Sequence, residues 1–162
     1  MSKINIFCFG FGQVAEGFIN KLIQEKKDFD LSITSRQETH QIELNNFKIT
    51  SYHFTDNKFD SSIDKKLKEA NYILISIPPI EGKDIVAKYF DKNLQSITNC
   101  KWITYLSATS VYGDHKGEWV NENSTTKPTS PNGSNRLAAE NTWKKLSNKH
   151  KYPLQIFRLA GI

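Results

Sequence analysis

A glycine-rich turn near the start of the chain decides the fold: it reads Gly10-Phe11-Gly12-Gln13-Val14-Ala15 and fits the pattern G-x-G-x-x-A. Before this turn, residues 4–9 are rich in β-branched and aromatic side chains, which favours a strand. After it, apolar residues recur over residues 14–23 with the period of an amphipathic helix. The sequence therefore predicts a strand, a tight turn and a helix in immediate succession.

This context is the one in which the glycine pattern indicates a binding site for a dinucleotide. Gly10 permits the tight bend, Gly12 leaves room for a diphosphate to approach the backbone, and Ala15 lets the helix pack close to the sheet. The N–H groups and positive dipole end of the helix, at Gln13 and Val14, would hold the diphosphate. The alternative is a purely structural turn.

The rest of the chain alternates between strand-like and helix-like segments. Strands are expected at 31–35, 48–54, 72–77, 102–106 and 154–159, and helices within 85–97 and 139–146, with a polar loop at 107–133. The run at 72–77 is continuously apolar, which is typical of a strand covered on both faces. We predict a single α/β domain over residues 1–162, with a doubly wound parallel sheet (Rossmann fold) of about six strands and helices on both faces.

The end of the second expected strand predicts which dinucleotide binds. It reads Thr34-Ser35-Arg36, without the acidic residue that accepts the ribose 2′-OH of NAD. The planar guanidinium of Arg36 and the two hydroxyls suit a 2′-phosphate, so NADP is favoured and NAD stays possible. Ser76 and Pro78 stand at the carboxyl end of the fourth strand, at the edge where open α/β sheets bind ligands, and are expected to touch the cofactor. The alternatives are a surface arginine and a turn that merely ends a strand.

Composition excludes several other classes of protein. Among 162 residues, 22 Lys and Arg against 17 Asp and Glu give a net charge of +5, but the lysines are dispersed, which indicates a solvated surface and no nucleic-acid partner. The four histidines lack metal-ligand spacing, so no metal site is expected. Cys8 and Cys100 fit core thiols in a reducing compartment. Without a leader or a membrane-length apolar run, we expect a cytoplasmic protein with no membrane partner.

Four ordered motifs extend the argument beyond the glycine turn. They are YLSATSVYGD at 105–114, GEWVNE at 117–122, SPNGSNRLAAE at 130–140 and FRLAGI at 157–162. With them the chain resembles the NAD(P)-dependent epimerase/dehydratase family, an extended and here atypical branch of the short-chain dehydrogenases/reductases. The resemblance implies a Rossmann fold with oxidoreductase or epimerase activity. It also implies a homodimer in which two corresponding helices of each copy pack together.

The resemblance also shows where this chain departs from the family's chemistry. The family uses a serine, a tyrosine as general acid/base, and a lysine that lowers the pKa of the tyrosine. The corresponding positions here are Ala108, Asn132 and Arg136. Since alanine has no donor and an amide cannot exchange a proton near neutral pH, the resemblance implies a degenerate catalytic triad. Arg136 keeps the positive charge and is expected to contact the cofactor's ribose.

Two alternatives to a non-catalytic cofactor-binding domain stay open. Hydroxyls from Ser107, Thr109, Ser110 or Tyr112 could replace the missing groups, with Thr109, Tyr112 and Arg136 as the catalytic set and a nucleotide-sugar-like substrate. Ser107 is also expected to contact the cofactor. The other alternative is a dinucleotide-sensing domain that works through a protein partner.

The end of the sequence carries a last expectation. Members of the family continue beyond the FRLAGI strand into a substrate-binding region, whereas the sequence at hand stops at Ile162. We therefore expect either a truncated form of a longer protein or a free-standing cofactor-binding domain. Phe157, Leu159 and Ile162 would then lie near an uncovered edge of the sheet. Such an edge favours a partner or a second copy of the chain.

Overall fold

The structure, a computed structural model, describes residues 3–160 and contains one seven-stranded sheet. The strands are β1 (Ile4–Phe9), β2 (Phe29–Ser35), β3 (His40–Leu44), β4 (Phe47–His53), β5 (Tyr72–Ile75), β6 (Trp102–Ala108) and β7 (Leu154–Leu159). Their order is β3-β4-β2-β1-β5-β6-β7, and every neighbouring pair is parallel except β3 with β4. The helices are α1 (Gln13–Gln24), α2 (Ser62–Glu69), α3 (Ile85–Gln95) and α4 (Pro131–His150), with a short 3-10 turn, η1 (Thr109–Val111).

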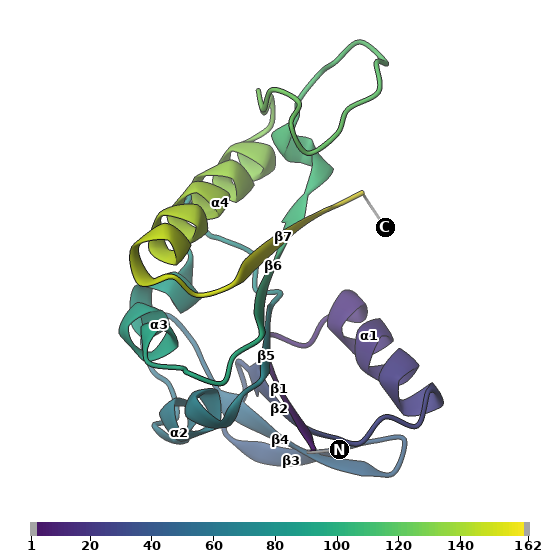
Figure 1. The fold of residues 1–162 in the computed structure, drawn as a ribbon, viewed down its shortest axis with the longest axis vertical. Coiled ribbons are helices and arrows are strands. Elements are labelled where there is room, and N and C mark those ends of the chain that lie inside the picture. Colours follow the sequence, from purple (N-terminus) through teal and green to yellow (C-terminus); the bar gives the residue numbers. More distant parts are fainter. Residues whose placement is uncertain (1–2, 161–162) are drawn as a thin grey trace.

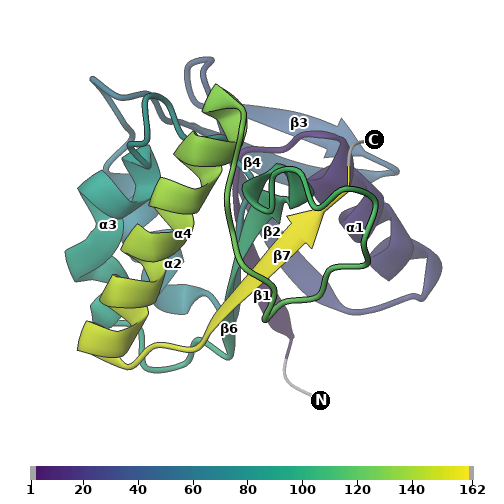
Figure 2. The same cartoon turned by 90° about the horizontal axis from the view of Figure 1, so that it is seen from above.

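The elements form three layers. Figure 1 shows α1 alone on one face of the sheet and α2, α3 and α4 together on the other. Seen from above, the same division separates α1 from the three-helix layer (Figure 2). The predicted doubly wound α/β fold is thereby confirmed.

Strand β1 shows how the sequence builds these layers. Successive side chains of a strand point to opposite faces, so Ile6 and Cys8 join the core beneath α1. Phe7 and Phe9 join the larger core beneath α2, α3 and α4. All four side chains are at most 4% exposed, which explains why residues 6–9 are apolar on both faces of the sheet.

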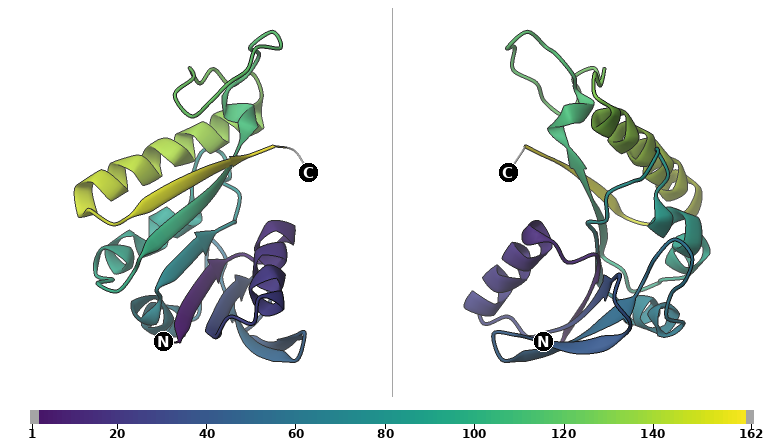
Figure 3. Two further views of the ribbon diagram at one scale, coloured as in Figure 1. Left: turned by 45° about the vertical axis from the view of Figure 1, so that its right-hand side comes forward. Right: turned by 180° about the vertical axis from the view of Figure 1, so that it is seen from behind.

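The order of the strands fixes where a ligand can bind. After β1 the chain builds β2 and β4 on one side of it, and then crosses to β5, β6 and β7 on the other. In open α/β sheets this reversal leaves a crevice at the carboxyl ends of the central strands. The 45° and 180° views in Figure 3 show the loop that follows β1 and the segment that follows β6 at this same end of the sheet.

Two elements were not predicted, and the estimate of about six strands was too low. Strand β3 pairs with β4 as an antiparallel edge hairpin through Asn45 and Asn46, both of which have positive φ. Helix α2 has only Ile63 and Leu67 buried along its eight residues. The apolar signal of both elements is too sparse to detect from the sequence alone.

Three predicted boundaries were also wrong. The strand expected at 72–77 ends at Ile75, where its register with β1 ends at Phe9; the Ser76 N–H makes a last bond to the Phe9 carbonyl at 2.9 Å. The loop expected at 107–133 is shorter at both ends, since β6 reaches Ala108 and α4 begins at Pro131. The Ser130 side chain caps α4 by accepting the Gly133 N–H at 3.1 Å.

The sheet is unevenly covered on the face that carries α1. Trp102 on β6 and Phe157 on β7 lie on this face and are 49% and 50% exposed. By contrast, Phe90 on α3 and Trp143 on α4 are fully buried in the core on the opposite face. Ile162 lies outside the described residues. Along residues 3–160, no helix combines the length and the apolar character that crossing a bilayer requires.

Candidate functional site

The glycine loop between β1 and α1 is held in one conformation. Gly10 has φ +80°, and a Cβ there would lie 2.8 Å from Ser76 Oγ. The Gly10 N–H donates to Thr34 Oγ1 at 2.9 Å, and Thr34 is 1% exposed at the end of β2. Ser76 Oγ in turn donates to the Phe9 carbonyl at 3.1 Å. The loop is therefore fixed by the ends of both strands that flank β1.

Gly12 has a different role from Gly10. It precedes α1 with φ −87°, which any residue adopts, and no protein atom lies within 4 Å of a Cβ built there. No side chain caps the first turn of α1. The glycine is therefore not needed for packing, and it keeps the approach to the N–H groups of α1 open.

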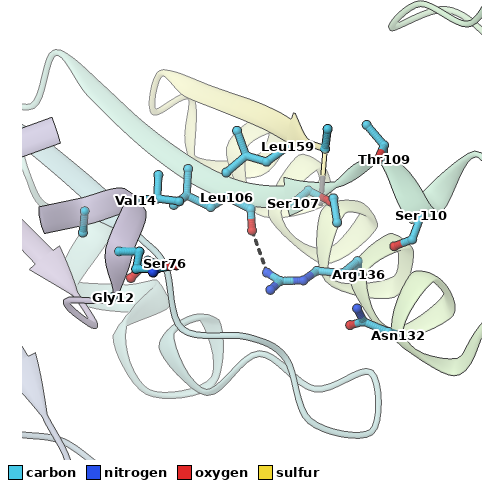
Figure 4. Close-up of a pocket in the computed structure, with 14 residues that line it drawn as sticks. Gly12, Val14, Ser76, Leu106, Ser107, Thr109, Ser110, Asn132, Arg136 and Leu159 are labelled. Atoms are coloured by element: carbon cyan, nitrogen blue, oxygen red, sulfur yellow. Dashed lines mark hydrogen bonds between the residues drawn. The ribbon is translucent and has the colours of Figure 1, made fainter. Parts of the chain in front are cut away.

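A cavity of about 420 Å³ opens beside this loop, at the carboxyl ends of β1, β5, β6 and β7. Its lining comprises Gly12, Gln13, Val14, Ala15, Ser76, Leu106, Ser107, Ala108, Thr109, Ser110, Asn132, Arg136, Leu159 and Ala160. Figure 4 shows the glycine turn facing Arg136 and Asn132 across the cavity. One elongated site thus joins the start of α1 to the start of α4.

Arg136 is the one charged side chain among the residues that line this cavity. Its Nη1 donates to the Leu106 carbonyl at 2.6 Å, as the dashed line in Figure 4 marks. Its Nε is buried and has no hydrogen-bond partner among the described residues. The guanidinium is therefore positioned by β6 while donors remain unused.

Ser107 connects the cavity to a buried ion pair. Its Oγ donates to Glu140 Oε1 at 2.6 Å. Glu140 has no exposed surface and receives two hydrogen bonds from Arg158, at 3.0 and 2.8 Å. Burial alone would raise the pKa of Glu140, but the hydrogen bonds from Arg158 and Ser107 outweigh it and hold this pKa below its usual value. Glu140 is thus a charged, paired carboxylate.

A second hollow of about 520 Å³ lies on the other side of this ion pair. Tyr112 lines it, with the Arg158 guanidinium 4.7 Å from the centre of its ring. Tyr112 does not line the first cavity. The structure therefore separates Tyr112 from Thr109 and Arg136, with which it was grouped as a catalytic set.

The residues predicted from the sequence divide into two groups. Those that line the first cavity are Gly12, Gln13, Val14, Ala15, Ser76, Ser107, Thr109 and Arg136. Those that do not are Gly10, Thr34, Ser35, Arg36, Pro78 and Tyr112. The hydroxyls of Thr34 and Ser35 both accept hydrogen bonds within the protein, from Gly10 N and from Ser51 Oγ. Arg36 is exposed directly after β2.

Three further lining residues were not anticipated: Leu106, Leu159 and Ala160. Their signal is topological, because they stand at the carboxyl ends of β6 and β7 and so reach the same edge as the glycine turn. Among residues 3–160, no group of three or more His, Cys, Asp or Glu side chains could hold a metal ion.

The site has the features that a dinucleotide needs. The glycine turn leaves open space where a Cβ would intrude, the uncapped start of α1 offers N–H groups, and none of the described residues that line the cavity is acidic. The residues present therefore fit a diphosphate at the α1 end.

Comparison with known proteins supports this fold. No family model matches the sequence, and no curated protein matches it. A conserved protein of unknown function from Silicibacter pomeroyi is 26% identical with a TM-score of 0.75, covering 98% of this chain and 54% of its own. UDP-N-acetylglucosamine 4-epimerase from Methanobrevibacter ruminantium M1, solved with UDP-N-acetylmuramic acid, is 17% identical with a TM-score of 0.75, covering 98% and 55%. UDP-glucuronic acid 4-epimerase from Bacillus cereus, solved with NAD, is 16% identical with a TM-score of 0.72, covering 97% and 56%.

The chain thus has the fold of the Rossmann portion of such epimerases, which confirms the predicted resemblance at the level of the fold. It spans about half the length of each of these three proteins.

Proposed function

We propose that this chain is an NADP(H)-binding domain of the atypical epimerase/dehydratase type, in which the family's acid/base set is degenerate. The observation that carries the proposal is the cavity itself. It runs from the glycine turn to the positions of the family's serine, tyrosine and lysine, yet Ala108, Asn132 and Arg136 stand there. A site that keeps the binding turn and has lost the proton-transfer groups is suited to hold a cofactor without the family's usual reaction.

The dinucleotide would be held mainly by the first turn of α1. Its N–H groups and its dipole favour the diphosphate, while Gly12 lets the phosphates approach the backbone. Ser76 and Ser107 line the neighbouring wall and offer hydroxyl oxygens. A bound nicotinamide would supply hydride chemistry, and this chain's residues would bind and orient it.

The preference for NADP is supported by the end of β2. Arg36 is exposed immediately after this strand, and no carboxylate replaces it in the sequence Thr34-Ser35-Arg36. A guanidinium there would pair with a 2′-phosphate. The Thr34 and Ser35 hydroxyls already accept hydrogen bonds within the protein, so Arg36 carries this preference.

A calorimetric titration of the chain with NADPH and with NADH tests both parts of the proposal. Tight binding of NADPH and weak binding of NADH are expected. Arg36→Ala should weaken NADPH binding by roughly 1–3 kcal/mol and leave NADH binding unchanged. Lys27→Ala, an exposed cation beyond α1, is the matched control. Failure to bind either nucleotide would contradict the proposal.

The enzymatic alternative depends on Tyr112, the phenol of the catalytic set predicted from the sequence. Its position in the second hollow, under Arg158, does not favour a role in this cavity. Turnover of NADPH that disappears in Tyr112→Phe would restore that alternative.

A further inference from the structure

The net charge of the chain resides in one layer of the fold. Helices α2, α3 and α4 together carry nine Lys and Arg against four Asp and Glu, which equals the net charge of +5 of the whole chain. The remaining residues hold 13 of each sign and are neutral in sum. Helix α1, alone on the other face of the sheet, carries one residue of each sign, Glu16 and Lys21. Lysines that are dispersed along the sequence therefore gather on the three-helix layer.

Most of this positive charge is exposed and unpaired. The exposed lysines on the three helices are Lys65, Lys68, Lys88, Lys92, Lys144, Lys145 and Lys149. Lys88 pairs with Asp56 at 2.8 Å, and Lys144 lies 3.5 Å from the buried Glu140. The other five form no ion pair at 4.0 Å or less with any of residues 3–160. The remaining acidic residues of the layer already have partners: Lys66 for Glu69, Asn93 for Asp64 and His150 for Asp91.

Four of the exposed lysines form two rows on neighbouring helices. Lys88 and Lys92 are four residues apart on α3, and Lys145 and Lys149 are four residues apart on α4. Side chains at this spacing lie on the same side of a helix, about 6 Å apart along its axis. Helices α3 and α4 pack side by side in the three-helix layer, as Figure 2 shows. We call the surface that these four lysines form the basic face.

The basic face does not suit a second copy of the same chain. From Ala138 to Lys149, the exposed residues of α4 are Ala138, Asn141, Thr142, Lys144, Lys145, Asn148 and Lys149, which include no acidic and no large apolar side chain. Two copies packed through α3 and α4 would place the lysines of one against the lysines of the other, and like charges in an interface are unfavourable. The charge of this face therefore calls for an acidic partner and departs from the expected homodimer of paired helices.

The composition of the basic face favours a protein partner over a nucleic acid. None of the exposed residues of α3 and α4 is an arginine or an aromatic residue. Proteins that bind nucleic acids use arginine forks to contact bases and phosphates, and aromatic rings to stack on bases. Lysines alone act as point charges, which pair equally well with the carboxylates of another protein.

We propose that the basic face docks an acidic helix of another protein, whose carboxylates pair with Lys88, Lys92, Lys145 and Lys149. Glutamates four residues apart on a helix repeat at the same spacing of about 6 Å as the lysines, so both rows can be matched at once. Exposed ion pairs each contribute little, so the complex is weak, forms rapidly and dissociates in salt. None of the four lysines lines the first cavity, and the docking is therefore independent of the proposed cofactor.

Titrations of the whole chain with a synthetic acidic helix test the proposal. The probe is a fluorescent peptide of four Glu-Ala-Ala-Ala repeats, and the same peptide with Gln in place of Glu is its neutral counterpart. We expect the acidic peptide to raise its anisotropy at low ionic strength and to bind about tenfold more weakly when the salt reaches physiological strength. The neutral peptide should not bind. In amide-detected NMR, the acidic peptide should shift the signals of residues 88–95 and 141–149.

Two double variants with the same loss of charge separate the basic face from net charge. Replacing Lys145 and Lys149 together by Gln removes one row of the basic face and should weaken the acidic peptide about tenfold. Replacing Lys26 and Lys27 together by Gln removes two exposed lysines that follow α1, on the other side of the sheet. This control should bind the peptide within about twofold of the wild type, because charges farther away than about 10 Å are screened.

Several results would overturn the proposal. Absence of peptide binding would do so, as would equal losses of affinity in the two double variants, because binding would then follow net charge. A single-stranded oligonucleotide of equal charge that binds more tightly than the peptide, with the same dependence on Lys145 and Lys149, would assign the face to nucleic acid. Sedimentation that finds a dimer whose α3 and α4 signals broaden in NMR would assign it to a second copy. None of these measurements depends on NADPH, so the proposed cofactor stands or falls separately.

Discussion

The Gly10 N–H donates a hydrogen bond to the side-chain oxygen of Thr34 at 2.9 Å, although 24 positions separate the two residues. This bond ties the turn after β1 to the end of β2. Thr34 is 1% exposed, so no water could replace its hydroxyl. The shape of the glycine turn is therefore set in part by a residue outside the motif.

Replacing the Thr34 hydroxyl should loosen this turn. Thr34→Val keeps the side-chain shape but leaves the Gly10 N–H without an acceptor, which costs about 1–3 kcal/mol of folding free energy. Urea unfolding measures the loss. Thr34→Ser retains the hydroxyl and should lie within about 1 kcal/mol of the wild type; equal stability of the valine and serine variants would contradict the assignment.

The two glycines of the turn should respond differently to alanine. Gly10→Ala places a Cβ 2.8 Å from Ser76 Oγ at φ +80°, so we expect a loss of about 1–3 kcal/mol in folding free energy. Gly12→Ala meets no protein atom within 4 Å and should leave the melting temperature nearly unchanged. The variant should instead bind NADPH more weakly, because the added methyl group occupies the approach to the N–H groups of α1. Thermal unfolding and calorimetry on both variants separate the effects, and unchanged NADPH affinity in Gly12→Ala would contradict the binding role.

Removing the charge of Glu140 should be strongly destabilising. Glu140→Gln leaves the Arg158 guanidinium buried without its carboxylate, at a cost of about 3–5 kcal/mol near neutral pH. Ser107→Ala removes a single bond and should cost about 1 kcal/mol. Denaturant unfolding of both variants is compared with Glu118→Gln, an exposed control that should match the wild type.

The same carboxylate predicts how stability depends on pH. Because the folded-state pKa of Glu140 lies below its unfolded value, its contribution is fully present above the unfolded value, about 4.5, and is lost as the pH falls through the lower folded value. Wild-type stability should therefore fall more steeply below about pH 4.5 than that of Glu140→Gln. Parallel pH profiles of unfolding for the two proteins would exclude this contribution.

Neither cysteine should be reactive in the folded protein. Burial raises the pKa of the Cys8 thiol to about 12 and that of Cys100 to about 11, so almost no thiolate is present at pH 7.5. Iodoacetamide followed by mass spectrometry should find both thiols unmodified under native conditions and both modified in urea. Rapid native labelling of Cys8, which has no exposed surface, would mean that β1 opens locally.

The central part of the fold could be predicted from the sequence because its signals are local. The change from a strand-like run to a helical period at Gly10 located β1 and α1, and the continuous apolar run at 72–77 located β5. Strand β3 and helix α2 carry few buried side chains, so their apolar pattern does not stand out. The early start of α4 did have a signal, because Ser130 followed by proline is a typical helix start.

The candidate site was predictable only where a motif carries it. Gly12, Ser76 and Arg136 belong to recognisable positions and do line the cavity. The role of Glu140 was not predictable, because its partners Ser107 and Arg158 lie 33 and 18 positions away and meet it only when α4 packs across the sheet. Sequence spacing indicates which chemistry a chain can carry, whereas pairing between distant charges depends on the register of the folded elements.

The three tryptophans give the molecule a built-in set of optical reporters. Trp143 is fully buried and donates to Asp84, Trp102 is 49% exposed on the sheet, and Trp119 is 101% exposed in the loop between η1 and α4. Indole emission shifts with the polarity around the ring, so Trp119 adds a constant solvent-like signal that carries no information on folding. With Trp119→Phe, the remaining fluorescence would come from Trp143 in the core beneath α4 and from Trp102 on the open face of β6. The signal would then report on both faces of the sheet.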